Sequence, residues 1–172
     1  MVTVSVSDGV SSSSTQFAIN LLPPNIAGSA TITTSSEQLD NAGTKAVDGV
    51  VGGWPDAPLN EWATDGEDWT SIVSQGDHAW IDLDWGQEVE IATILLHDRP
   101  NSNDQITSGR LLFSDGSIVN VDELPNDGSE FRVNFSARTV SSVRFFITGV
   151  SFKTVHTGLA EILVLSPTSI EE

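Results

Sequence analysis

The sequence predicts an all-β protein, an antiparallel β-sandwich of the jelly-roll type. Short segments with alternating apolar and polar residues recur at spacings of about ten residues, and Gly, Pro, Asn and Asp turn signals separate them. The clearest alternation lies at residues 78–85, where Ile81 and Leu83 would face one way and Asp82 and Asp84 the other. No segment keeps helical periodicity for more than a turn or two.

The first 24 residues are expected to form a unit of their own. Alternating valines precede an Asp8-Gly9 turn signal, and Phe17, Ile19 and Leu21 alternate after it, which predicts a β-hairpin. We interpret this hairpin as the remnant of a preceding immunoglobulin-like repeat, or as an element that packs on the main domain. Pro23-Pro24 is stiff and lacks amide donors, so it is expected to be a linker.

The main domain is expected at residues 25–166, followed by a tail at 167–172. A strand at 89–96 should end before Pro100, which cannot donate to a β-ladder. Five polar residues at 101–105 then form a loop, and a further strand at 111–113 ends at a Ser-Asp-Gly-Ser turn. Later strands are predicted at 118–121, 131–135, 143–147 and 159–165.

The charge of the chain excludes several partners. Its 172 residues include 24 acidic and 7 basic ones, a net charge of −17, which repels phosphate backbones and anionic lipid surfaces. We therefore expect no nucleic acid as a partner and no membrane insertion, and no stretch approaches the roughly 20 apolar residues of a membrane span. There is no cysteine and no recognisable signal peptide.

Catalysis is not expected. The three histidines fall in no metal-binding spacing, and no phosphate-binding loop, nucleophile elbow or recognisable acid–base pair of carboxylates is present. The sequence thus predicts no catalytic residues.

Several short motifs, in order, resemble those of one known family. They are Lys45 to Gly49, Asp98-Arg99, Gly109-Arg110-Leu111, Ser114-Asp115-Gly116 and His156 to Ile162, with weaker matches at 25–27 and 80–83. Together they resemble the discoidin, or coagulation-factor type C, modules and the related family 32 carbohydrate-binding modules over roughly residues 25–165. The resemblance implies a galactose-binding-domain-like sandwich that binds carbohydrate without transforming it. We expect a monomeric module covalently joined to catalytic or adhesive domains of a larger secreted protein.

The resemblance also implies a structural calcium ion. Its ligands would be Asp48, Glu161 and the carbonyl of Ala160, and Ca²⁺ indeed prefers six to eight carboxylate and carbonyl oxygens. Glu161 is an acidic residue inside an apolar strand, which is costly unless it is paired or coordinated. The alternative is that Glu161 pairs with an arginine such as Arg144, or reaches solvent at the strand end.

Sugar recognition needs convergent planar donors and acceptors, usually beside an apolar platform. The polar loop after the strand at 89–96, the loop before the last strand and the irregular segment at 50–76 provide such groups. The predicted ligand-binding residues are Trp54, His97, Asp98, Arg99, Asn103, Asp104 and His156.

Some of these residues have structural alternatives. Asp98-Arg99 is equally explained as an internal salt bridge that stiffens its loop. Trp62 is interpreted as core, and Trp80 and Trp85 as packing residues, while Trp54 and Trp69 remain candidate platforms. The rival function is a protein-binding adhesion module, or an architectural spacer without sugar affinity.

Overall fold

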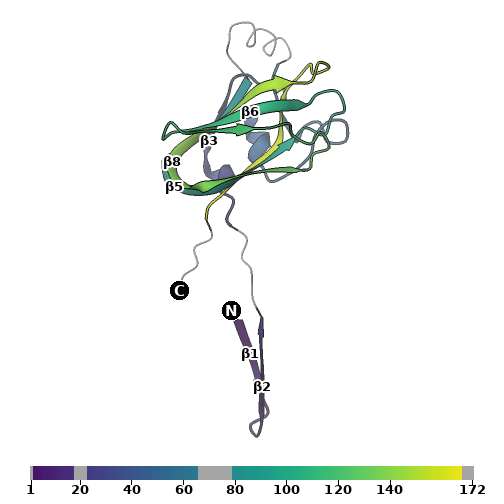
Figure 1. Cartoon of the computed structure of the whole chain (residues 1–172). Helices are drawn as coiled ribbons and strands as arrows, with labels where there is room; N and C mark the ends of the chain where they lie inside the picture. Colours follow the sequence, from purple (N-terminus) through teal and green to yellow (C-terminus); the bar gives the residue numbers. More distant parts are fainter. Residues whose placement is uncertain (1, 18–22, 66–78, 168–172) are drawn as a thin grey trace.

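The computed structural model describes residues 2–17, 23–65 and 79–167 (Figure 1). The N-terminal part forms a hairpin around the Asp8-Gly9 turn, as expected, in which β1 (Val2–Ser7) pairs antiparallel with β2 (Ser12–Phe17). Strand β2 lies on the serine tract, however, and shares only Phe17 with the expected second strand. The expected alternation at Ile19 and Leu21, the candidate platform Trp69 and the last five residues lie outside the described residues.

The main body is an antiparallel β-sandwich, as predicted. Its strands are β3 (Thr31–Thr34), β4 (Trp62–Ala63), β5 (Ala79–Asp98), β6 (Ile106–Phe113), β7 (Ile118–Val121), β8 (Glu130–Val150) and β9 (Gly158–Leu165). They are hydrogen-bonded in the order β4-β9-β5-β8-β6-β7, with β3 on β5. Two 3₁₀ turns, η1 (Ala27–Ser29) and η2 (Gly43–Val47), complete the described elements. No helix in the described parts of the chain has the length and apolarity of a membrane span.

Two long strands belong to both layers of the sandwich. The first half of β5 pairs with β3 and with the second half of β8, whereas its second half pairs with β9 and the first half of β8. The change of layer coincides with a register shift between Asp84 and Val89, where Gly86 has a φ of 64°. Figure 1 shows β5 and β8 bending together from one layer to the other. The separate strands expected at 131–135 and 143–147 are therefore two halves of β8.

The core lies between the layers and includes the tryptophan expected there. Trp62 is fully buried, and its indole Nε1 donates to the carbonyl oxygen of Ser36 at 3.1 Å. Trp85 packs against the core and donates to the Ile26 carbonyl at 3.0 Å, and the Arg144 guanidinium lies 4.1 Å from the centroid of the Trp80 ring. These three tryptophans are packing residues, as the sequence indicates.

Strand β9 links two opposite ends of the sandwich. Its first residues pair with β4, beside the loop that precedes Gly158, whereas Leu165 pairs with Thr93 of β5 and with Asn25. The amide of Ser166 donates to the carbonyl of Pro24 at 3.2 Å. The two chain connections of the sandwich thus lie together, at the end of β9 remote from the loops around Arg99.

Candidate functional site

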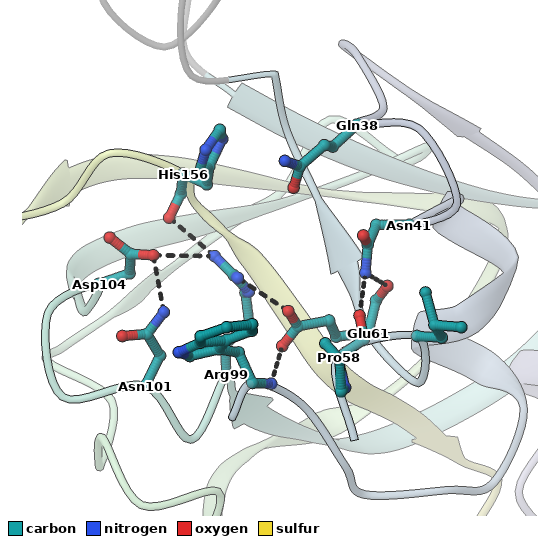
Figure 2. A pocket seen from close by; sticks show the side chains of 10 residues that line it. Gln38, Asn41, Pro58, Glu61, Arg99, Asn101, Asp104 and His156 are labelled. Carbon is teal, nitrogen blue, oxygen red and sulfur yellow. Dashed lines mark hydrogen bonds and ion pairs between the residues drawn. The ribbon is translucent and has the colours of Figure 1, made fainter. Parts of the chain in front are cut away.

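Four loops meet around a pocket at the end of the sandwich where β5 ends and β9 begins (Figure 2). Its volume is about 330 Å³. Nearly all of its lining side chains are polar or aromatic, and they come from the β3–η2 loop, the loop before β4, the β5–β6 loop and the β8–β9 loop. The pocket is lined by Gln38, Asn41, Trp54, Pro58, Leu59, Glu61, Arg99, Asn101, Asp104 and His156.

A buried cluster of three charges forms the floor of the pocket. Nη2 of Arg99 lies 2.8 Å from Oε1 of Glu61, and Nη1 lies 3.2 Å from Oδ2 of Asp104. Nη1 also donates to the carbonyl oxygen of His156 at 2.9 Å. All three charged residues are buried, and one guanidinium serves two carboxylates. The cluster therefore has a net charge of −1 and disfavours anionic ligands.

The β5–β6 loop is tied together at its base by Asp98. This carboxylate is 2% exposed; its Oδ1 accepts from the amide of Arg99 and its Oδ2 from the amide of Ile106, each at 2.8 Å. The same side chain thus holds the first residue of the loop and the first residue of β6. Burial is the main cause that raises the pKa of Asp98 to about 7, and the two amide donors partly oppose it.

This raised pKa predicts how stability depends on pH. Because the folded state binds the Asp98 proton more tightly than the unfolded state, the stabilising contribution of the protonated form is fully present below pH 3.8 and is lost as pH rises through about 7. An Asp98→Asn variant cannot lose a proton there. The difference in unfolding free energy between the wild type and Asp98→Asn should shrink as pH rises from 5 to 8, by on the order of 2 to 4 kcal/mol.

Urea unfolding of the wild type and Asp98→Asn at four pH values measures this effect. The exposed Asp127, which likewise accepts an amide, provides the control Asp127→Asn, whose difference from wild type should stay constant over the same range. A difference for Asp98→Asn that stays constant from pH 5 to 8 would show that the buried carboxylate is charged throughout this range.

The loop that bears Trp54 is fixed by Glu61 and Asn41. Oε2 of Glu61 accepts from the amide of Trp54 at 3.1 Å, while Nδ2 of Asn41 donates to the carbonyls of Pro58 and Glu61 at 2.6 and 3.0 Å. Gly53 is required here, because a Cβ atom at this position would clash with the Glu61 carboxylate. The backbone of Trp54 is thus held, yet its side chain is 54% exposed at the pocket rim.

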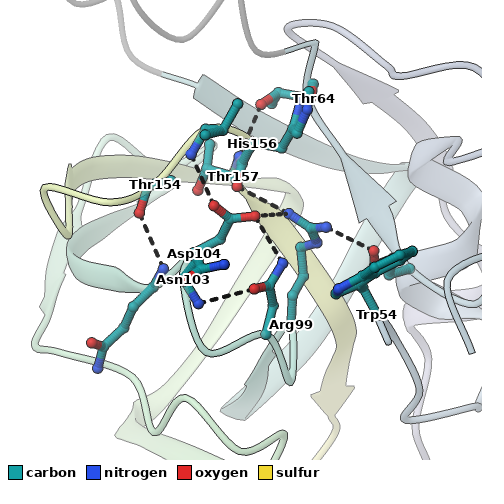
Figure 3. A network of polar contacts seen from close by, with 12 residues as sticks. Trp54, Thr64, Arg99, Asn103, Asp104, Thr154, His156 and Thr157 are labelled. Carbon is teal, nitrogen blue, oxygen red and sulfur yellow. Dashed lines mark hydrogen bonds and ion pairs between the residues drawn. The ribbon is translucent and has the colours of Figure 1, made fainter. Parts of the chain in front are cut away.

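His156 presents an acceptor at the pocket. Its Nδ1 lies 3.1 Å from the carbonyl oxygen of Thr64 (Figure 3). A carbonyl only accepts, so Nδ1 bears the hydrogen, and Nε2 of the neutral ring is an acceptor with no partner among the described residues. The side-chain amide of Gln38 and Oδ1 of Asn41 are likewise without hydrogen-bond partners in the described part of the chain.

Four of the seven predicted ligand-binding residues come together in the pocket, namely Trp54, Arg99, Asp104 and His156. The other three do not line it. Asp98 is buried below the loop, and His97 points its Nδ1 at the carbonyl of Gly128, 2.9 Å away. Asn103 is exposed on the loop, where its backbone amide donates to Oδ1 of Asn101. The alternative interpretation of Asp98-Arg99, an internal salt bridge, is not found among the described ion pairs, since Arg99 pairs with Glu61 and Asp104.

Six lining residues are absent from the predicted set, namely Gln38, Asn41, Pro58, Leu59, Glu61 and Asn101. An acidic residue directly before the buried Trp62 was the one available signal for Glu61. Gln38 and Asn41 lie in a loop rich in Ser and Thr, and they reach the pocket only because the amide of Gln38 donates to Ala63 and that of Ala63 to Asn41. That contact has no signature in the sequence.

The predicted calcium ligands lie close together on the η2–β9 side of the sandwich. Glu161 is 1% exposed, and its two carboxylate oxygens accept from the amide of Gly49 at 3.2 and 3.3 Å. Burial, with the neighbouring Asp48 carboxylate, raises the pKa of Glu161 to about 7. Neither acid forms an ion pair with a described residue, and the alternative partner Arg144 is engaged by Asp82 at 2.9 Å.

The chemistry of this pair fits Ca²⁺. Two carboxylates without a cation are hard oxygen donors, and the 48–50 turn and the Ala160 carbonyl belong to the segments that bear them. The described residues contain no group of three or more metal-binding side chains, so backbone carbonyls and water would have to complete the coordination.

A second hollow lies at the opposite end of β9. Its volume is about 460 Å³, and four of its eight lining residues are apolar, namely Pro23, Leu95, Leu163 and Leu165. It holds none of the predicted site residues.

The fold is shared with solved sugar-binding modules. The family 32 carbohydrate-binding module of NanJ from Clostridium perfringens, in complex with galactose, is 18% identical, with a TM-score of 0.61, over 81% of this chain and 96% of that one. The fucose-binding module SpX-3 of Streptococcus pneumoniae is 17% identical, with a TM-score of 0.64, over 83% and 98%. The lectin domain of lectinolysin, complexed with Lewis B antigen, is 23% identical, with a TM-score of 0.62, over 86% and 100%.

These similarities define the class of the fold, which is the galactose-binding-like β-sandwich of the family 32 carbohydrate-binding modules and discoidin-like lectin domains. Within that class, the chain belongs to the family described as a domain of unknown function, DUF7402, whose model matches residues 25–165.

Proposed function

We propose that the sandwich is a non-catalytic carbohydrate-binding module that binds an uncharged sugar in the pocket around Arg99. The observation that carries this proposal is the exposed Trp54 indole at the rim of a pocket with a buried, hydrogen-bonded floor. An indole face packs against the C–H side of a sugar ring, while the Gln38 amide, Oδ1 of Asn41 and Nε2 of His156 offer donors and acceptors for its hydroxyls.

The charges of the pocket support a particular class of sugar. The Arg99 cluster has a net charge of −1, and the whole chain has one of −17. A uronate, sialate or sulfated sugar would meet repulsion in a place where solvent screens little. Neutral sugars are therefore the proposed ligands. The solved modules named above, in complexes with galactose and Lewis B antigen, support a sugar ligand for this fold.

The proposal is tested by affinity electrophoresis and calorimetry against neutral polysaccharides, namely galactan, xyloglucan, galactomannan and β-glucan, with polygalacturonate and alginate as anionic counterparts. We expect binding to at least one neutral polysaccharide, with a Kd on the order of 0.1 to 1 mM for a soluble fragment. Trp54→Ala should weaken it at least about tenfold. The matched control is Ile118→Ala, which removes an equally exposed side chain (54%) from β7.

A folded protein that binds none of these polysaccharides, nor any glycan on a broad array, would overturn the proposal. That result would favour the rival functions, a protein-binding adhesion module or an architectural spacer. Binding that Trp54→Ala leaves unchanged would show that the sugar sits elsewhere.

We propose further that Asp48, Glu161 and the Ala160 carbonyl bind a structural Ca²⁺. Support comes from two neighbouring carboxylates, one of them buried, that no described basic residue neutralises. A cation there would remove the cost of the buried Glu161 charge and fix the 48–50 turn to β9.

The setting of the module is also a proposal. We infer that residues 25–166 act as one monomeric domain of a larger secreted protein, with 1–24 derived from a preceding immunoglobulin-like repeat and 167–172 forming a tail. In support, residues 3–16 of the hairpin are exposed throughout, so this hairpin adds nothing to the sandwich core. Several weak modules on one chain would gain affinity by multivalency.

A further inference from the structure

The β8–β9 loop holds a phenylalanine almost entirely in solvent. Phe152 is 94% exposed, and Val155 in the same loop is 60% exposed. Between Ser151 and Thr154 the chain makes a tight turn, closed by a hydrogen bond from the amide of Thr154 to the carbonyl of Ser151 at 3.0 Å. An exposed aromatic ring at a turn tip contributes nothing to the core and leaves apolar surface in water.

Both ends of this turn are tied to the β5–β6 loop. The amide of Ser151 donates to the carbonyl of Gln105 at 2.9 Å, and its hydroxyl donates to the carbonyl of Asn103 at 3.0 Å. On the other side, the amide of Gln105 donates to Oγ1 of Thr154 at 3.2 Å. The turn is therefore held in place, and the ring of Phe152 projects from a fixed backbone.

Asp104 joins the turn to the floor of the pocket. Its Oδ1 accepts from the amide of Val155 at 2.8 Å, while its Oδ2 receives Arg99 and the side-chain amide of Asn101 (Figure 3). His156, the next residue along the chain, lines the pocket. Phe152 is four residues from His156, a stretch of chain that spans at most about 14 Å. The exposed ring thus lies within a short reach of a sugar bound in the pocket.

We propose that Phe152 is a second stacking platform, which packs against a neighbouring sugar of the same glycan chain whose first sugar occupies the pocket. This inference rests on the proposed function, and it deepens it: the ligand is an oligosaccharide or polysaccharide, and a lone monosaccharide fills only part of the site. Because the turn is already fixed, little conformational entropy is lost when a ring packs on Phe152.

The acidity of the chain argues for a sugar over a lipid surface at this tip. A net charge of −17 repels anionic bilayers, and the tip itself offers a single cation, Lys153, whose Nζ lies 5.7 Å from the centroid of the Phe152 ring. A sugar ring presents C–H groups to the aromatic face and hydroxyls to the ammonium, so it satisfies both groups at once.

The test is a chain-length series measured by calorimetry, using mono- to pentasaccharides of galactan, glucan and mannan. In whichever of these three series the wild type binds, its affinity should rise at least about tenfold from the monosaccharide to the pentasaccharide. Phe152→Ala should abolish this rise and leave the monosaccharide Kd within about twofold, whereas Phe152→Trp should retain the rise. Ile118→Ala controls for the loss of an exposed apolar side chain elsewhere, and melting curves verify that all variants are folded.

Each outcome is decisive. A wild type that binds a sugar with no dependence on chain length, or a rise that survives Phe152→Ala, overturns the second platform and leaves the proposed function standing. Equal weakening of monosaccharide and pentasaccharide by Phe152→Ala also overturns it, because the ring would then belong to the pocket itself. A wild type that binds no member of any series overturns the platform and the proposed function together.

Discussion

An Arg99→Met variant is expected to lose about 3 to 5 kcal/mol of unfolding free energy. The methionine fills the space of the arginine stem but leaves the Glu61 and Asp104 carboxylates, 2% and 6% exposed, without their shared cation. It also removes the hydrogen bond to the carbonyl of His156, which connects the β5–β6 and β8–β9 loops. Urea unfolding measures the loss, and sugar binding should disappear with it.

The chain provides a matched control for this experiment. Arg132 and Glu130 form an ion pair at 3.0 Å, close to the 2.8 Å of Arg99 and Glu61, but their side chains are 47% and 41% exposed. Arg132→Met should therefore cost less than about 1 kcal/mol. Adding Glu61→Gln and Asp104→Asn to Arg99→Met should recover part of the lost stability. Equal costs for the two arginine variants would show that burial does not govern the Arg99 cluster.

Calcium should stabilise the wild type by about 2.7 kcal/mol when its concentration reaches a hundredfold excess over its Kd. For a chain of this size the melting temperature should rise by about 5 to 10 °C, and EDTA should reverse the rise. Glu161→Gln and Asp48→Asn should abolish the response, because each removes one of the two carboxylates. Thermal melting in calcium and in EDTA measures all three proteins.

A second Asp-Gly turn in the same chain controls for local geometry. Asp115 accepts from the amide of Ser117 at 2.8 Å, as Asp48 accepts from the amide of Val50 at 2.9 Å, and the glycine that follows each has a φ of 82°. Asp115→Asn should leave the response to calcium intact. If the melting temperature of the wild type is the same in calcium and in EDTA, no structural calcium ion binds there.

The sandwich could be predicted because period-two alternation is a local property of the sequence. The continuity of the two long strands, β5 and β8, could not be predicted, because their passage from one layer to the other depends on β-bulges. Between Asp84 and Val89 a register shift bends β5 without ending it, so the sequence suggests two strands where the structure has one. The same applies to β8 between Val133 and Val143. Such bends are fixed by packing between layers, which alternation does not encode.

The site was predictable where its residues adjoin strong local signals. Arg99 and Asp104 follow a strand that stops before Pro100, and His156 precedes the last apolar strand, so all three were expected at loop positions. The role of Asp98 was less predictable, because an aspartate at this position can either bind a ligand or be a buried carboxylate that accepts hydrogen bonds from backbone amides. Its two hydrogen bonds, to residues one and eight positions later, depend on where β6 begins. The place of Glu61 in the pocket could not be predicted without knowing its contact with Arg99, which is 38 residues later in the chain.

The position of the chain connections has a mechanical consequence. Both leave the sandwich beside Leu165, while the pocket lies at the other end of β9, seven residue steps or roughly 23 Å away. If a glycan occupies the pocket as proposed, a pull between it and the polypeptide runs along β9 and loads the hydrogen bonds between this strand and its neighbours β4 and β5 in shear. Many bonds must then break together, so this arrangement would resist tension between the pocket and the two chain connections.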